Sequence, residues 1–121
     1  MFYLAAGLIV LVGIAHSYLG ERYILTRLFR RDDLPKLLGG TQFTKDTLRF
    51  AWHITTFAWF GFALILIYLA AGEISKQIVG NIVGATFLIH FLVALIASKG
   101  KHLSWVVFLV ISIASLYASN T

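Results

Sequence analysis

The chain contains four hydrophobic runs that are each long enough to cross a membrane. They lie at residues 2–20, 49–72, 77–98 and 102–119. A bilayer core is roughly 30 Å thick, and about 20 apolar residues span it as an α-helix. The runs lack the period-2 alternation of transmembrane β-strands and the charged face of helices in soluble proteins. With 60% hydrophobic and 12% charged residues, the sequence predicts an all-α integral membrane protein.

We expect these helices to form a four-helix bundle of up-down topology, a single transmembrane domain over residues 1–121. Short links join the second run to the third and the third to the fourth, so these pairs should be antiparallel neighbours. Residues 21–48 form a longer connection. At its start, Tyr23 and Ile24 should belong to the apolar stripe of an amphipathic helix, and a further short helix is expected over residues 34–38.

The basic residues predict the orientation in the membrane. Of the ten Lys and Arg residues, all but Lys76 lie in or beside segments 21–49 and 99–101. By the positive-inside rule these segments face the cytoplasm, and both termini lie outside it. We therefore expect a multi-pass protein of a bacterial-type inner (plasma) membrane.

The net charge of +5 suits contact with a membrane surface. Anionic headgroups attract each nearby basic side chain by about 1 kcal/mol. Asp32, Asp33 and Asp46 interrupt the basic run, and no aromatic platform accompanies it. The expected partner on this side is therefore the anionic lipid headgroup, and no nucleic acid is expected.

The chain has no Cys, which excludes disulfides, thiol chemistry and iron–sulfur clusters. It also lacks the soft ligands of a copper carrier. No phosphate-binding loop, nucleophile elbow or Ser-His-Asp order is present, so no catalytic residues are predicted and the sequence leans away from an enzyme.

Each hydrophobic run carries one of the four histidines, and all four lie toward the basic side. At about 1.5 Å of rise per residue, His16 should lie about 7–9 Å inside the cytoplasmic boundary and His53 about 6 Å. His90 should lie about 13 Å inside, while His102 should lie at the interface. Ionisable groups at membrane depth are costly and usually mark a site.

The helical faces predict that these histidines point inward. His16 shares a stripe with Gly13 and Gly20, whose small size permits close helix contact. His53 shares a face with Arg49 and Thr56. Convergence of at least three histidines is therefore expected.

Three chemistries fit inward imidazoles. The first is haem b ligation by histidines at one depth, with Arg49 near a propionate and aromatic walls from Phe50, Trp52, Phe57, Phe87 and Phe91. The second is a divalent metal ion bound by His16, His53 and His90, with Glu21 or Asp46 as an oxygen ligand. The third is a quinone or lipid pocket or a proton relay, in which histidine only hydrogen-bonds or titrates.

The leading hypothesis is binding of haem or a metal ion, for redox chemistry or transport, through His16, His53 and His90. One alternative is an accessory membrane protein with structural histidines, each contributing about 0.6 kcal/mol to helix association. Another is a small proton-linked transporter subunit, which in a chain this short would require an oligomer. Gly80 and Gly84 form a GxxxG motif that suits close packing, either within the chain or in a homo-oligomer.

Overall fold

The computed structural model describes residues 1–121 and is helical throughout apart from the connections. This confirms the all-α prediction. The elements are α1 (Phe2–Leu19), the π-helical turn η1 (Gly20–Leu25), α2 (Thr26–Leu28), α3 (Gln42–Ala71), α4 (Lys76–Ala97) and α5 (Ser104–Asn120). Because α1, η1 and α2 are continuous, they form one helix of 27 residues.

Three helices are long and apolar enough to cross a membrane: Phe2–Leu28, Gln42–Ala71 and Lys76–Ala97. The fourth, Ser104–Asn120, is apolar but has only 17 residues. The observed ends agree closely with the predicted runs, except that α3 begins at Gln42, well before the expected start of the second run at residue 49.

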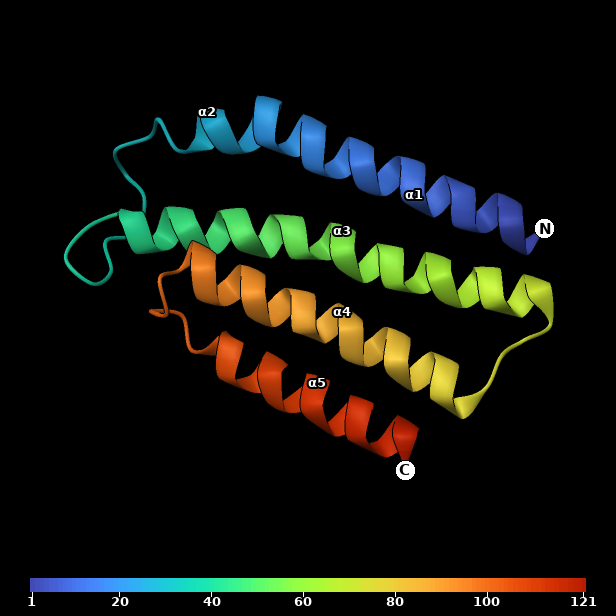
Figure 1. Cartoon of the computed structure of the whole chain (residues 1–121). Coiled ribbons are helices and arrows are strands. Elements are labelled where there is room, and N and C mark those ends of the chain that lie inside the picture. Colours follow the sequence, from blue (N-terminus) through green and yellow to red (C-terminus); the bar gives the residue numbers. More distant parts are fainter.

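The four main helices lie side by side in the order α1, α3, α4, α5 (Figure 1). Each helix contacts only its neighbours in this row, so α1 does not reach α4 or α5, and α3 does not pack on α5. The expected bundle is therefore an open layer rather than four helices around a common core. The physical reason lies in the small residues, which bring consecutive helices together at three separate seams.

The seam between α1 and α3 follows the stripe of small residues predicted on the first run. Ala6, Gly13 and Gly20 are all buried. A Cβ at Gly13 would meet the Phe60 ring at 3.0 Å, and one at Gly20 would overlap the Trp52 indole. Glycine is therefore required where α1 approaches α3.

The GxxxG motif of α4 forms the seam with α5. A Cβ at Gly80 would overlap Ser119, and one at Gly84 would overlap Leu116. The Ser112 hydroxyl donates to the Gly84 carbonyl at 2.8 Å across the same seam. The motif therefore serves packing within the chain.

The seam between α3 and α4 uses a third glycine. A Cβ at Gly61 would lie 2.6 Å from the Thr86 hydroxyl. The link between these helices is short: Gly72, with φ of 74°, ends α3, and the Ser75 hydroxyl accepts a hydrogen bond from the backbone N–H of Ile78. A left-handed glycine and an N-terminal serine are standard end signals of helices.

The first helix continues past Gly20 into the long connection, as expected, but it does so through the π-helical turn η1. Tyr23 and Ile24 are each 48% exposed, whereas Leu25 is 2% exposed. The cause is η1, because a π-turn adds about one residue to a helical turn. From Gly20 to Leu25 the buried positions therefore step by five residues instead of four.

The short helix expected over residues 34–38 is absent. The chain instead makes a tight turn in which Leu37 and Gly40 exchange backbone hydrogen bonds. Leu38 and Gly39 hold φ of 53° and 90°, the left-handed values of a primed turn. Nearby, Arg31 binds Asp33 in an ion pair of 2.6 Å and holds the pKa of that carboxyl below its ordinary value.

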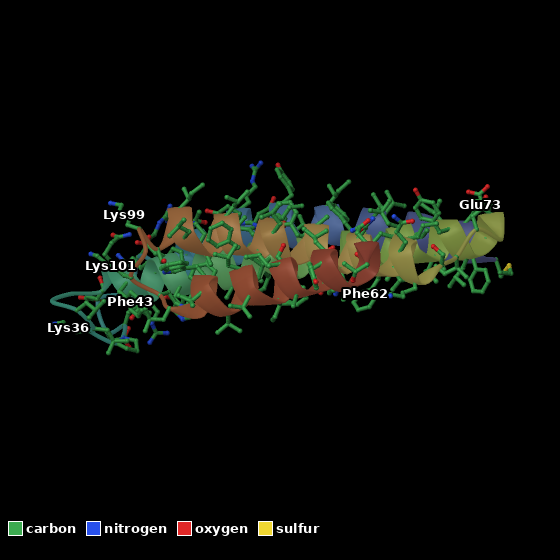
Figure 2. The ribbon with its side chains drawn as sticks, turned by 60° about the horizontal axis from the view of Figure 1, so that its bottom comes forward. Lys36, Phe43, Phe62, Glu73, Lys99 and Lys101 are labelled. Atoms are coloured by element: carbon green, nitrogen blue, oxygen red, sulfur yellow. The ribbon has the colours of Figure 1, made fainter.

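The charged residues separate toward the two ends of the layer. Figure 2 shows Lys36, Lys99 and Lys101 at one end, with Glu73 at the other. Both termini lie toward the end of the layer that holds the α3–α4 link (Figure 1). The structure thus has one basic end. Glu21 of the first helix and Arg49 of α3 form an ion pair toward this end.

The seams predict opposite effects for two classes of glycine. Gly80→Ala should lower the free energy of unfolding by about 1–3 kcal/mol, because its methyl group overpacks against Ser119. Gly7→Ala is the control: nothing lies within 4 Å of that position, so the better helix propensity of alanine should raise stability by about 0.5–1 kcal/mol. Unfolding of the detergent-solubilised protein measures both, and equal effects would contradict the assigned α4–α5 seam.

Candidate functional site: a polar chain between α1 and α3

The predicted site residues Glu21, Arg49 and His53 contact one another at the basic end of the α1–α3 seam. Arg49 Nη2 lies 2.8 Å from Glu21 Oε1, and Arg49 Nε donates to Oε2 at 3.2 Å. His53 Nε2 lies 3.0 Å from the same Oε2. The carboxylate therefore accepts two N–H groups from one guanidinium and faces an imidazole.

Two hydroxyls extend this contact toward the middle of the layer. His53 Nδ1 lies 2.9 Å from Ser17 Oγ, and Ser17 Oγ lies 2.6 Å from Thr56 Oγ1. The Thr56 hydroxyl donates to the Gly13 carbonyl at 3.1 Å. We call Arg49, Glu21, His53, Ser17 and Thr56 the polar chain.

Helical periodicity explains why these side chains meet. Gly13, Ser17 and Glu21 follow at intervals of four residues and lie on one face of the first helix. On α3, His53 and Thr56 follow Arg49 at intervals of four and three, as the sequence predicted. Because the two helices run in opposite directions, the residues pair in reverse order along the seam.

Exposure falls along the polar chain from the basic end inward. The side chains of Arg49, Glu21 and His53 are 44%, 35% and 27% exposed, and Thr56 is 5% exposed. Water can therefore reach the carboxylate, while the inner hydroxyls depend on one another for hydrogen bonds.

If every hydrogen bond of the polar chain is made, the chain holds one proton more than it would with neutral His53 and ionised Glu21. A carbonyl only accepts, so Thr56 donates to Gly13 and must accept from Ser17. Ser17 then has no hydrogen left for His53, and His53 Nδ1–H must donate to Ser17. The short contact between His53 Nε2 and Glu21 needs a second proton. Arg49 donates to both carboxylate oxygens, so the arrangement with every bond made is one in which both ring nitrogens would carry a hydrogen.

Loss of that proton reverses the two hydroxyls. Neutral His53 keeps Nε2–H on Glu21 and offers Nδ1 as an acceptor to the Ser17 hydroxyl. Ser17 then accepts from Thr56, and the bond from Thr56 to the Gly13 carbonyl is lost. At 3.1 Å it is the longest of the bonds that the two hydroxyls make along the polar chain. The polar chain therefore has two arrangements that differ by one proton.

His16 lies on the same seam but in another environment. Its ring stacks on the Trp52 indole with centroids 4.5 Å apart. His16 Nε2 lies 3.2 Å from the Trp52 carbonyl, and Trp52 Nε1 donates to the His16 carbonyl at 2.9 Å. This reciprocal pair ties α1 to α3 beside Gly20, so His16 serves the helix contact.

The other two histidines lie elsewhere in the layer. His90 on α4 is 5% exposed, and its Nδ1 lies 2.8 Å from the Thr86 carbonyl of its own helix. Its ring packs edge-on to Phe108 of α5. The expected convergence of three histidines is therefore wrong, because an open layer places α4 away from the α1–α3 seam.

His102 lies in the connection between α4 and α5, where its Nδ1 is 2.8 Å from the Ser104 hydroxyl. Its ring packs against Phe43 and Phe50 of α3.

The expected metal ligands do not assemble. The structure contains no group of three or more His, Asp or Glu side chains that could hold a metal ion. Of the proposed set, only His53 and Glu21 are in contact. Both ring nitrogens of His53 already have hydrogen-bond partners, so ligation of a metal ion or haem iron would first have to break one of these bonds.

Sequence reasoning did not single out Ser17 or Trp52 as partners of the histidines. A signal was present for Ser17, because it precedes Glu21 by one helical turn at the depth of His53. No such signal existed for the stacking of His16 on Trp52, which depends on the rotation of α1 against α3.

A groove opens on one face of the layer beside the polar chain. Its volume is about 520 Å³. We call it the His53 groove, and it is lined by Ile14, Ser17, Tyr18, His53, Thr56, Phe57 and Phe60. His16 is not part of this lining, so the groove presents the polar chain and not the stacked pair.

Comparison of the chain with family models, curated proteins and solved structures finds no match.

The polar chain predicts a difference between two adjacent threonines. Thr56→Val should lower the free energy of unfolding by about 1 kcal/mol, because the buried hydroxyl connects Ser17 to the Gly13 carbonyl. Thr55→Val is the matched control, since the Thr55 hydroxyl only donates to Ala51 of its own helix. Equal changes in detergent unfolding experiments would show that the bond across the seam contributes nothing.

Proposed function

We propose that the protein is an integral membrane protein whose four helices all span the bilayer, with the basic end in the cytoplasm and both termini outside. The support is the exposed surface: only 16 of 121 residues are buried, and long apolar side chains cover the outer faces. An open layer has little core, but in lipid its apolar faces need no protein partner. At 17 residues, α5 is about 25 Å long, near the lower limit for a spanning helix.

We further propose that the polar chain is a proton-exchanging site that serves a molecule dissolved in the membrane. The observation that carries this is the contact of His53 with both Glu21 and Ser17. It joins a carboxylate that water can reach to hydroxyls that line the His53 groove. A proton taken up at Glu21 and His53 is held on the His53 ring beside the groove, and the two hydroxyls reorient so that Ser17 can accept the bond from Nδ1–H.

The extent of the polar chain favours this role over transport through the protein. The bonded side chains end at the carbonyl of Gly13, near the middle of the helix Phe2–Leu28. No ionisable side chain follows on α1 toward the N-terminus except Tyr3. A route that ends halfway suits delivery to a site, whereas a transporter needs access from both sides.

Cysteine labelling tests the topology. The native chain has no Cys, so single cysteines report without background. In intact cells, Ile74→Cys in the α3–α4 link should react with a membrane-impermeant maleimide, and Gly40→Cys should react only after lysis. The opposite pattern would overturn the orientation.

Nuclear magnetic resonance of ¹⁵N-histidine-labelled protein tests the proton site. Glu21→Gln should change the pH dependence of the His53 ring signals, because the His53 Nε2 atom loses its carboxylate partner. His102, which has no acidic partner, is the internal control and should respond as in the unaltered protein. An unchanged His53 response would show that Glu21 and His53 do not share a proton.

A further inference from the structure

A second groove adjoins the His53 groove across two side chains of α3. Phe57 and Phe60 of α3 line both. The second groove, between α3 and α4, has a volume of about 480 Å³, and eight of its eleven lining residues are hydrophobic. An occupant with its head beside His53 can therefore extend across α3 with an apolar tail.

The lining indicates an uncharged head. No Lys, Arg, Asp or Glu lines either groove, although Arg22 and Glu21 bond the lining residues Tyr18 and His53 from outside. The Tyr18 hydroxyl accepts a hydrogen bond from Arg22 and keeps its own hydrogen to donate. Ser17 and His53 bond each other, so either one donates to a carbonyl oxygen only when that oxygen takes the place of their mutual bond.

The aromatic residues indicate a flat head. Phe57 and Phe60 form an edge-to-face pair with centroids 6.4 Å apart, and Tyr18 lies in the same lining. Aromatic faces of this kind pack on planar rings. A planar ring with carbonyl oxygens and a long hydrocarbon tail is the structure of a prenylated quinone.

We propose that the joined grooves bind a membrane quinone, with one ring carbonyl accepting a hydrogen bond from Ser17 or His53 Nδ1–H. The ring lies against Phe57 and Phe60, and the tail follows the groove between α3 and α4. This inference rests on the proposed function, because the proton of the polar chain is what the bound carbonyl would meet. It concerns binding and includes no redox step.

The test uses decylubiquinone with the full chain in phosphatidylcholine nanodiscs, followed by quenching of tryptophan fluorescence. The unaltered protein should bind saturably. Ser17→Ala should weaken binding about fivefold, the loss expected for one hydrogen bond, and Phe57→Ala should weaken it at least as much. Phe62→Ala is the control, because Phe62 is 60% exposed and lines neither groove (Figure 2).

Competitors identify the chemistry of the occupant. Decylbenzene has the tail and ring but no carbonyl. Judged by how well it reverses the quenching, it should bind at least about fivefold more weakly than decylubiquinone. Equal displacement would overturn the hydrogen-bonded carbonyl, and preferential displacement by phosphatidylglycerol would assign the groove to a phospholipid. Equal binding by Ser17→Ala, Phe57→Ala and Phe62→Ala would place the quinone elsewhere.

The two proposals fail separately. If decylubiquinone does not bind but Glu21→Gln still changes the pH dependence of His53, the quinone is wrong and the proton site remains. If quinone binding follows the predicted variants but His53 is insensitive to Glu21, the groove binds a quinone without a coupled proton.

Discussion

The close approach of α1 to α3 is the constraint on which the rest of the site depends. Gly13 and Gly20 allow the two backbones near enough for side chains of one helix to reach carbonyls of the other. Trp52 bonds the His16 carbonyl, and Thr56 bonds that of Gly13. Larger residues in this stripe would separate the helices and leave the inner hydroxyls without partners in an apolar surrounding, where such groups are costly.

The open layer and the polar chain are connected features. A closed bundle would cover the α1–α3 seam with α4 or α5 and leave no entry from the membrane. In the layer, each seam has two faces, and the polar chain borders a groove on one of them. The same arrangement separates His90 from His53, so the fold that creates the groove also prevents a cluster of histidines.

Much of the architecture could be predicted because each signal is local. Hydrophobic length predicted the helices, and the stripe of Gly13 and Gly20 predicted which face of α1 is buried. The face shared by Arg49, His53 and Thr56 was also correct. One prediction failed because it depended on more than one helix: His90 does not join His16 and His53, since α4 makes no contact with α1. Another failed because apolar periodicity does not reveal the backbone turn at Leu38, which replaced a short helix.

The sequence alone determined four apolar helices, the basic end and the set of inward-facing residues, because length, charge and periodicity are properties of single segments. Only the tertiary structure decided which of those residues meet. The rotation of α1 against α3 placed Glu21 and Ser17 in contact with His53, and it placed Trp52 in contact with His16. The order of helices in the layer placed His90 apart. These outcomes depend on packing between helices, where small residues set the distance and no pattern within one segment sets the partner.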